Sequence, residues 1–147
     1  MITLAEGWGE LVGEPDAWSG EYLGFPVYAR RNSMGVWCGY IGLPTGHPWS
    51  GLSDPHNVAV HGGVSYGQNS LTDRAVGDFS DWYLGFDCGH HGDFIPSFVA
   101  AEPGVDPLAT ATRLHATYDC HIVYRTLEYA QAELRSLAEQ ASRVAQG

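Results

Sequence analysis

The sequence predicts an α+β domain in which a mostly antiparallel sheet is covered by a long C-terminal amphipathic helix. Glycine and proline separate the two parts, because all eight prolines and every glycine except Gly147 precede residue 108. The spacing of apolar residues changes as well, from alternation in the first part to steps of three and four in the last. A length of 147 residues suits one domain. We therefore expect residues 1–147 to form a single domain, with a Gly-rich β segment at 1–112 and a helix at about 119–146.

Four stretches of the Gly-rich segment have the pattern of strands. Residues 25–31 and 36–42 are rich in aromatic and β-branched residues, and the sequence NSMG between them predicts a hairpin turn. Residues 57–66 and 82–88 alternate between two faces, as half-buried strands do. In residues 57–66 the valines form one face, so we expect His61 to point away from the core.

The C-terminal helix has the clearest periodicity in the sequence. Apolar residues recur in an a/d pattern from Cys120 to Val144, and Asp119 is a suitable N-cap. Two interpretations remain open at this point. The apolar stripe either covers one face of the chain's own sheet or pairs two chains, which its narrowness and its small alanines favour. From the second interpretation we expect a homodimer or a higher homo-oligomer formed through this helix.

Charge and hydropathy exclude several classes of protein. The formal charge is −10, all seven basic residues are arginines, and residues 113–147 contain four arginines and four acidic residues, so the negative charge belongs to residues 1–112. An acidic surface repels phosphate backbones, which argues against nucleic acid as a partner. No stretch approaches the roughly 18 apolar residues of a membrane span, so we expect no membrane partner. An N-terminus unlike a secretory signal and an odd number of cysteines predict a cytoplasmic protein with free thiols.

The segment DCGHHGD at residues 87–93 is the first candidate site. It places carboxylate, thiol and imidazole groups in a loop at the end of an apolar strand, where binding and catalytic residues are often found. If the protein is an enzyme, the candidate catalytic residues are His61, Cys88, His90 and Asp93. In that interpretation Cys88 is a nucleophile and His61 or His90 is its base.

A zinc site is a second interpretation of the same loop. Cys88, His90 and one of His47, His56 or His61 would supply ligands that suit zinc, and Asp87 or Asp93 would orient an imidazole. The chain contains no C-x-x-C pair and no H-E-x-x-H motif, so the sequence does not establish any cofactor.

The segment HGGVSY at residues 61–66 is the second candidate site. Paired glycines within a strand pattern mark a bulge or a close approach to the backbone. His61, Ser65 and Tyr66 would then provide a base, a hydroxyl and a stacking ring. Aromatic residues make up 12% of the chain, and we expect some of them to line a pocket for a planar ring. A phosphate in that pocket would need Arg30, Arg31 or Arg74 opposite it.

Four segments together resemble a family of small proteins encoded by bacteriophages and bacterial genomes. They read GYIGLPTGHP at 39–48, HGGVSY at 61–66, GFDCGHHGD at 85–93 and YRTLEY at 124–129, and the resemblance covers about residues 35–140. The chain departs from the family pattern at Val64, Ser65 and Gly89, where Leu, Thr and Ala are usual. The matching positions are His47, His61, Gly62, Gly63, Tyr66, Asp87, Cys88, His90 and Asp93.

The resemblance implies a role in takeover of a bacterial host, by analogy with small phage proteins that counter immunity. The leading hypothesis is a binding protein that sequesters a nucleotide-derived signalling molecule. Its expected ligand-binding residues are His47, His61, Tyr66, Asp87, Cys88, His90 and Asp93. Two alternatives remain: a metal- or cysteine-assisted hydrolase of such a molecule, and an acidic protein–protein inhibitor that mimics nucleic acid.

Overall fold

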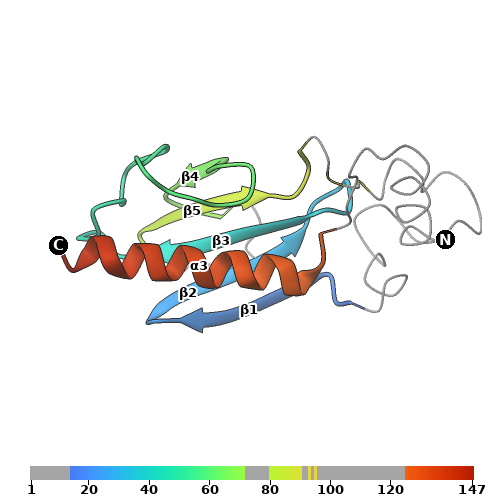
Figure 1. Ribbon diagram of the computed structural model, residues 1–147, viewed down its shortest axis with the longest axis horizontal. Helices are drawn as coiled ribbons and strands as arrows, with labels where there is room; N and C mark the ends of the chain where they lie inside the picture. The colour runs from blue at the N-terminus through green and yellow to red at the C-terminus, as the bar shows by residue number, and fades with distance from the viewer. Residues whose placement is uncertain (1–13, 72–79, 91–92, 94, 96–124) are drawn as a thin grey trace, which may run out of the picture.

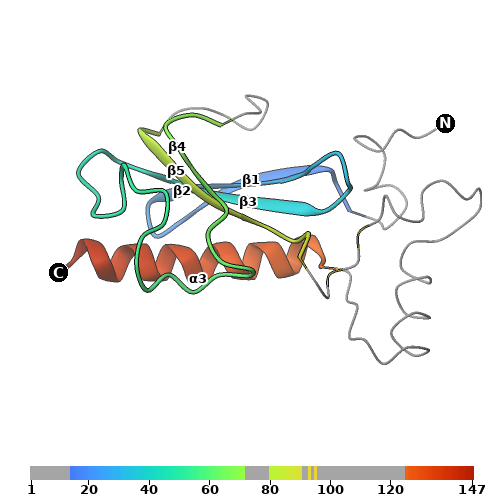
Figure 2. The same ribbon diagram turned by 90° about the horizontal axis from the view of Figure 1, so that it is seen from above.

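Short turns and alternating side chains build one antiparallel sheet. The computed structural model describes residues 14–71, 80–90, 93, 95 and 125–147. Within them the strands follow the order β1-β2-β3-β5-β4, and helix α3 packs on one face of the sheet (Figures 1 and 2). The predicted α+β class is confirmed. The strands are β1 (Ala17–Tyr22), β2 (Phe25–Arg31), β3 (Trp37–Leu43), β4 (Tyr66–Gln68) and β5 (Trp82–Asp87).

Two tight turns connect the first three strands. The predicted hairpin between β2 and β3 is confirmed, with the side chain of Asn32 accepting a hydrogen bond from the Met34 N–H and Gly35 at φ +85°. A second hairpin, which the sequence did not predict, joins β1 to β2 through Leu23 and Gly24, at φ +54° and +86°. Two positive φ angles match the right-handed twist of the paired strands. The strand β1 has exposed or half-buried residues throughout, and Ser, Gly and Glu interrupt its apolar residues, so its sequence lacks a clear strand pattern.

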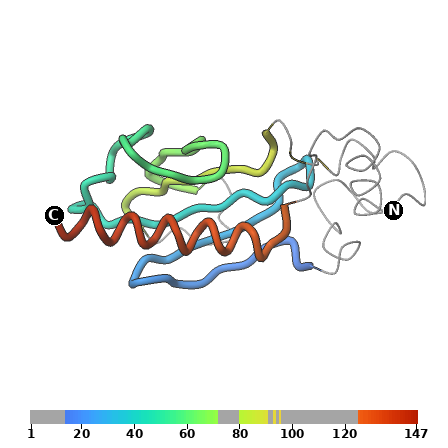
Figure 3. The backbone as a smooth tube through the Cα atoms, in the orientation of Figure 1, coloured from blue at the N-terminus to red at the C-terminus, as the bar shows by residue number. Residues whose placement is uncertain are grey.

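The connection from β3 to β4 leaves the sheet and runs beside the helix, as the green part of the trace shows in Figures 2 and 3. The prediction of a strand over residues 57–66 was wrong, because only Tyr66 belongs to a strand. Asn57, Gly62 and Gly63 have positive φ angles, which are incompatible with an extended ladder. The valines of this stretch still pack against the core.

The core lies between the sheet and the helix. The strand β5 alternates as predicted, since Leu84 and Phe86 pack in this core whereas Tyr83 belongs to a smaller cluster with Tyr28 and Leu71. Of the tryptophans, Trp37 and Trp49 are buried in this core and Trp18 and Trp82 pack partly buried against it, whereas Trp8 lies outside the described residues. The other buried members of the core include Val27, Ala29, Ile41, Leu43, Leu134, Leu137 and Ala138.

The helix α3 (Leu127–Ala145) begins later than the sequence predicted. Thr126 has an extended backbone, and its hydroxyl accepts a hydrogen bond from the Tyr129 N–H at 3.0 Å, so it is the N-cap. The predicted cap, Asp119, lies outside the described residues. The buried stripe of Ala130, Leu134, Leu137, Ala138 and Ala141 faces the chain's own sheet. This packing favours the first interpretation of the stripe, and an oligomer stays a prediction.

A buried arginine ties the start of the helix to the sheet. The side chain of Arg31 is 1% exposed and stacks over Trp37 at 4.6 Å. Its guanidinium donates to Glu14 Oε1 at 2.8 Å, and Glu14 Oε2 accepts from the Leu127 N–H at 2.6 Å. The carboxylate therefore satisfies a buried cation and an unpaired N–H of the first helical turn together. Because its guanidinium is buried and paired with Glu14, Arg31 does not suit the phosphate-binding role that the sequence suggested for it.

Within the described part of the chain, no helix combines the length and the apolar character that crossing a membrane requires.

The turn between β1 and β2 gives a stability prediction. Leu23 is 63% exposed and has a left-handed backbone, which costs an L-residue with a large side chain roughly 1–2 kcal/mol. Replacement by Asn, which adopts this conformation more easily, is expected to raise the free energy of unfolding by about 0.5–1 kcal/mol in urea denaturation. The matched control is Leu52→Asn, at a residue that is 46% exposed and is not among the positive-φ positions. An equal gain at Leu52 would contradict the explanation.

Candidate functional site

Side chains of the helix hold the connection between β3 and β4 in place. Gln140 accepts from the Ala59 N–H at 2.8 Å and donates to the Ala59 carbonyl at 2.7 Å. Glu133 accepts from the His61 N–H at 2.7 Å. These bonds replace the strand ladder that the alternation of residues 57–66 predicted. His61 therefore faces the helix and bonds polar groups there, with only 12% of its side chain exposed.

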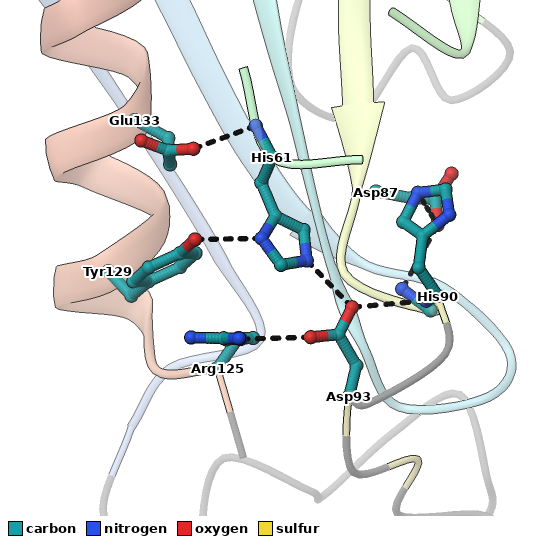
Figure 4. A network of polar contacts seen from close by, with 8 residues as sticks. His61, Asp87, His90, Asp93, Arg125, Tyr129 and Glu133 are labelled. Atoms are coloured by element: carbon teal, nitrogen blue, oxygen red, sulfur yellow. Dashed lines mark hydrogen bonds and ion pairs between the residues drawn. The ribbon is translucent and has the colours of Figure 1, made fainter. Parts of the chain in front are cut away.

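The carboxylate of Asp93 joins three distant parts of the chain (Figure 4). Oδ2 lies 2.7 Å from His61 Nε2 and accepts from the His90 N–H at 3.0 Å. Oδ1 accepts from Arg125 Nε at 2.8 Å. The side chain of Asp93 is 1% exposed, so these donors replace the water that an ionised carboxylate would otherwise bind. His61 and Asp93, both predicted from the sequence, are thus brought into direct contact.

The hydrogen bonds fix the tautomer of His61. The ionised Asp93 carboxylate only accepts, so the proton of the imidazole lies on Nε2. Nδ1 is then a free acceptor, and it lies 2.7 Å from the hydroxyl of Tyr129. The phenol O–H therefore donates to Nδ1, which makes a continuous line of hydrogen bonds from phenol to imidazole to carboxylate (Figure 4).

Two pKa shifts follow from these contacts. Burial would raise the pKa of Asp93, but hydrogen bonds from Arg125, His61 and the His90 N–H outweigh it and hold the pKa below the ordinary value of 3.8. Burial and the nearby Glu133 carboxylate raise the pKa of Tyr129, and Arg125 partly opposes them. At neutral pH the site therefore contains an ionised carboxylate and a protonated phenol.

Arg125 is the cation of the site. Its guanidinium is held from two sides, by the Nε bond to Asp93 and by stacking at 4.7 Å over the ring of Tyr129. The side chain is 27% exposed, and neither Nη atom has a hydrogen bond within the part of the chain that the structure describes. Arg125 is therefore immobilised, and neither of its N–H₂ groups is used by a described residue.

His90 lies at the rim of the cluster. Its ring packs against Gly62, where a Cβ would come within 2.2 Å of Nε2, so the paired glycines do allow a close approach, here by an imidazole. Nε2 lies 3.3 Å from Asp87 Oδ1 in poor hydrogen-bond geometry and has no hydrogen-bond partner among the described residues. The side chain is 37% exposed. His90 and Asp87 thus belong to the predicted site, beside His61 at a ring separation of 5.9 Å.

Three predicted site residues lie elsewhere. His47 is buried, accepts from the Trp49 N–H through Nδ1, and donates through Nε2 to the Ala141 carbonyl of the helix at 2.9 Å, so both nitrogens are used. Tyr66 donates to the Ser70 carbonyl and packs against Tyr40 in the cluster on the opposite face of the sheet. The structure therefore does not bring these residues together with His61, and their part in ligand binding stays a prediction.

Cys88 is the third predicted site residue that lies outside the cluster around Asp93. It is 1% exposed and belongs to the hydrophobic core, because it continues the inward face of β5. Burial raises the pKa of its thiol strongly, and the neighbouring Asp93 adds to the shift. A buried, protonated thiol is a poor nucleophile, so the cysteine-assisted mechanism is not supported. Cys38 and Cys88 are free thiols, as predicted; Cys120 lies outside the described residues.

The candidate zinc set does not assemble. Across residues 14–71, 80–90, 93, 95 and 125–147, no three His, Cys, Asp or Glu side chains are grouped closely enough to hold a metal ion. Cys88 points into the core and His47 is satisfied by the helix, whereas His56 is exposed. The proposed combination of Cys88, His90 and a third histidine is therefore wrong.

The sequence reasoning missed three residues of the site, all from the C-terminal part. Arg125, Tyr129 and Glu133 are spaced by four residues, and Tyr129 and Glu133 lie on one stripe of the helix toward His61. The signal was present, because YRTLEY was one of the segments that carried the family resemblance. The apolar a/d stripe of the same helix predicts its buried face and carries no information about its polar face.

Comparison with models of known protein families found no match. Comparisons with curated proteins and with solved structures found no match either. The resemblance to phage and bacterial proteins stays a prediction from the motifs.

The buried carboxylate gives a prediction for stability and pH. Asp93→Asn removes the charge that Arg125 and His61 bond, and is expected to lower the free energy of unfolding at pH 7 by roughly 1–3 kcal/mol. Because the pKa of Asp93 is lower in the folded protein, its contribution is complete above 3.8 and disappears as pH falls through the folded-state value. The difference between wild type and variant should therefore shrink below about pH 4 in urea denaturation.

The matched control for this experiment is Asp54→Asn, which changes an exposed aspartate. It is expected to change the free energy of unfolding by less than about 0.5 kcal/mol at every pH. A loss at Asp93 that stays constant down to pH 3 would contradict the assigned charge state.

Proposed function

We propose that the protein binds a small nucleotide-derived ligand at the Asp93 cluster, defined as His61, Asp87, His90, Asp93, Arg125, Tyr129 and Glu133. The observation that carries the proposal is the state of Arg125. Its Nε and its ring stack fix the guanidinium, and its two Nη groups, which have no hydrogen bond among the described residues, match the bidentate geometry that a phosphate offers. An arginine immobilised before binding loses little further side-chain entropy when it meets an anion.

The charges of the cluster restrict the ligand. Asp87, Asp93 and Glu133 carry three negative charges against the single positive charge of Arg125. One of the three, Asp93, is neutralised by Arg125 at 2.8 Å. A triphosphate would meet repulsion from the remaining carboxylates, whereas one phosphodiester carries a single charge. We therefore infer a ligand with one phosphodiester group, such as a cyclic mononucleotide.

The rim of the cluster supports the rest of such a ligand. The His90 ring is 37% exposed and is fixed against Gly62, so it offers a flat surface for a base. Asp87 lies beside it and accepts from the Gly89 N–H with the same Oδ1, and its Oδ2, which has no hydrogen bond among the described residues, suits a base or ribose donor. These features suit recognition of a planar, polar molecule.

The biological role that we propose is sequestration of a nucleotide immune signal in a phage-associated setting, in the cytoplasm. The family resemblance supports this role, and the anion site is compatible with it. The metal- and cysteine-assisted forms of the alternative hydrolase lack support, since the zinc set does not assemble and Cys88 is buried. The acidic protein–protein inhibitor stays a prediction that rests on net charge.

A binding experiment tests the proposal. Isothermal titration with cyclic mononucleotides, cyclic dinucleotides, ADP-ribose, ATP and inorganic phosphate should give the tightest binding for a cyclic mononucleotide. Arg125→Gln is expected to weaken that binding about 10- to 100-fold, because a charge-assisted hydrogen bond contributes roughly 1.5–3 kcal/mol.

Arg135→Gln is the matched control, since Arg135 also stacks on a tyrosine, Tyr22, at 5.1 Å, on a part of the helix away from the cluster. It should bind as the wild type does. Absence of binding by the wild type to every compound, or equal loss in both variants, would overturn the proposal.

A further inference from the structure

We propose that the hydrogen-bonded line Tyr129–His61–Asp93 is a proton relay, and that Tyr129 is a catalytic residue which activates a hydroxyl for attack on the bound phosphodiester. This inference rests on the proposed function, because the same cluster must first hold the ligand. It assigns chemistry to a residue of the helix to which the sequence had given no role, and it needs neither the thiol nor a metal.

The geometry gives each group one role. Asp93 holds the Nε2 proton of His61 at 2.7 Å, so Nδ1 remains basic and is directed at the phenol. The Glu133 bond to the His61 N–H fixes the backbone of the same residue, so the ring is positioned from both ends. This is the arrangement in which a carboxylate orients an imidazole as a base for a hydroxyl, a logic that recurs on unrelated folds.

The phenol is in the state that the relay requires. Its raised pKa keeps it protonated at neutral pH, so it donates to Nδ1 and its oxygen remains an acceptor. Among the described residues His61 is the one hydrogen-bond partner of this hydroxyl. The guanidinium over the ring, 4.7 Å away, stabilises negative charge that develops on the oxygen during transfer.

The proposed step conserves atoms and charge. A water molecule gives a proton to Tyr129 Oη while the phenol proton passes to His61 Nδ1, and the water oxygen forms a bond to phosphorus. The bond from phosphorus to the leaving oxygen breaks, and the imidazolium returns its proton through Tyr129 to that oxygen. Asp93 stabilises the imidazolium in between without taking the proton. The net reaction adds water to a phosphodiester and yields a phosphomonoester and an alcohol, which for a cyclic mononucleotide are parts of one molecule.

The test measures binding and turnover separately. Wild-type protein is incubated with the cyclic mononucleotide that binds best, and the linear monophosphate is followed by chromatography. Tyr129→Phe keeps the ring beneath Arg125 and removes the hydroxyl. Turnover should fall about 100- to 10,000-fold, the range of general acid–base catalysis, while the dissociation constant changes less than about threefold.

Two further variants separate chemistry from folding. Tyr22→Phe makes the same change in a tyrosine that also lies beneath an arginine, away from the cluster, and should turn over as the wild type does. His61→Gln retains groups that hydrogen-bond both Asp93 and Tyr129 but cannot take up a proton, so it should bind ligand and lose turnover.

The outcomes are distinguishable. Binding by the wild type without product would overturn the relay and leave the proposed binding function intact. Absence of binding would overturn the proposed function itself. Full turnover in folded Tyr129→Phe or His61→Gln, judged by circular dichroism and thermal melting, would exclude Tyr129 or His61 from the reaction.

Discussion

The buried carboxylate of Asp93 is the interaction on which the arrangement of the site depends. An ionised carboxylate with 1% of its side chain exposed is costly unless donors replace its water. Its donors come from the connection between β3 and β4, from its own loop and from Arg125 just before the helix cap, and the first and last of these lie 32 residues away in sequence. Satisfying this one group therefore brings together the connection beside α3, the loop after β5 and the start of the helix.

A second carboxylate repeats the same principle at the other side of the helix start. Glu14 bonds the buried Arg31 and the Leu127 N–H, as Asp93 bonds Arg125 and His61. The first residues of α3 are thus fixed to the sheet by ionic contacts, whereas the rest of the helix is fixed by apolar packing. The polar stripe of the helix is left to organise the site, which explains why Tyr129 and Glu133 reach His61.

Charge decides which chemistry the site suits. The cluster has more carboxylates than cations, and Arg125 carries its only fixed positive charge among the described residues. A ligand of low charge is compatible with this balance, and the proposed proton relay adds no further charged side chain to the cluster. Asp93 links the two proposed roles, because it holds both Arg125, which would bind the ligand, and His61, which would take the proton from Tyr129.

The sequence by itself determined the α+β class, the hairpin of β2 and β3, the inward face of β5 and the apolar stripe of the helix. These features follow from local periodicity and turn chemistry, which neighbouring residues specify. It also indicated His61, His90, Asp87 and Asp93 as site residues. Only the tertiary structure decided which of these meet, because contacts between His61, Asp93 and Tyr129 span 32 to 68 residues. The alternation of apolar residues wrongly predicted a strand at 57–66, and the position of Cys88 in its motif wrongly suggested an accessible thiol. Neither pattern contains information on how buried polar groups find hydrogen-bond partners across the fold.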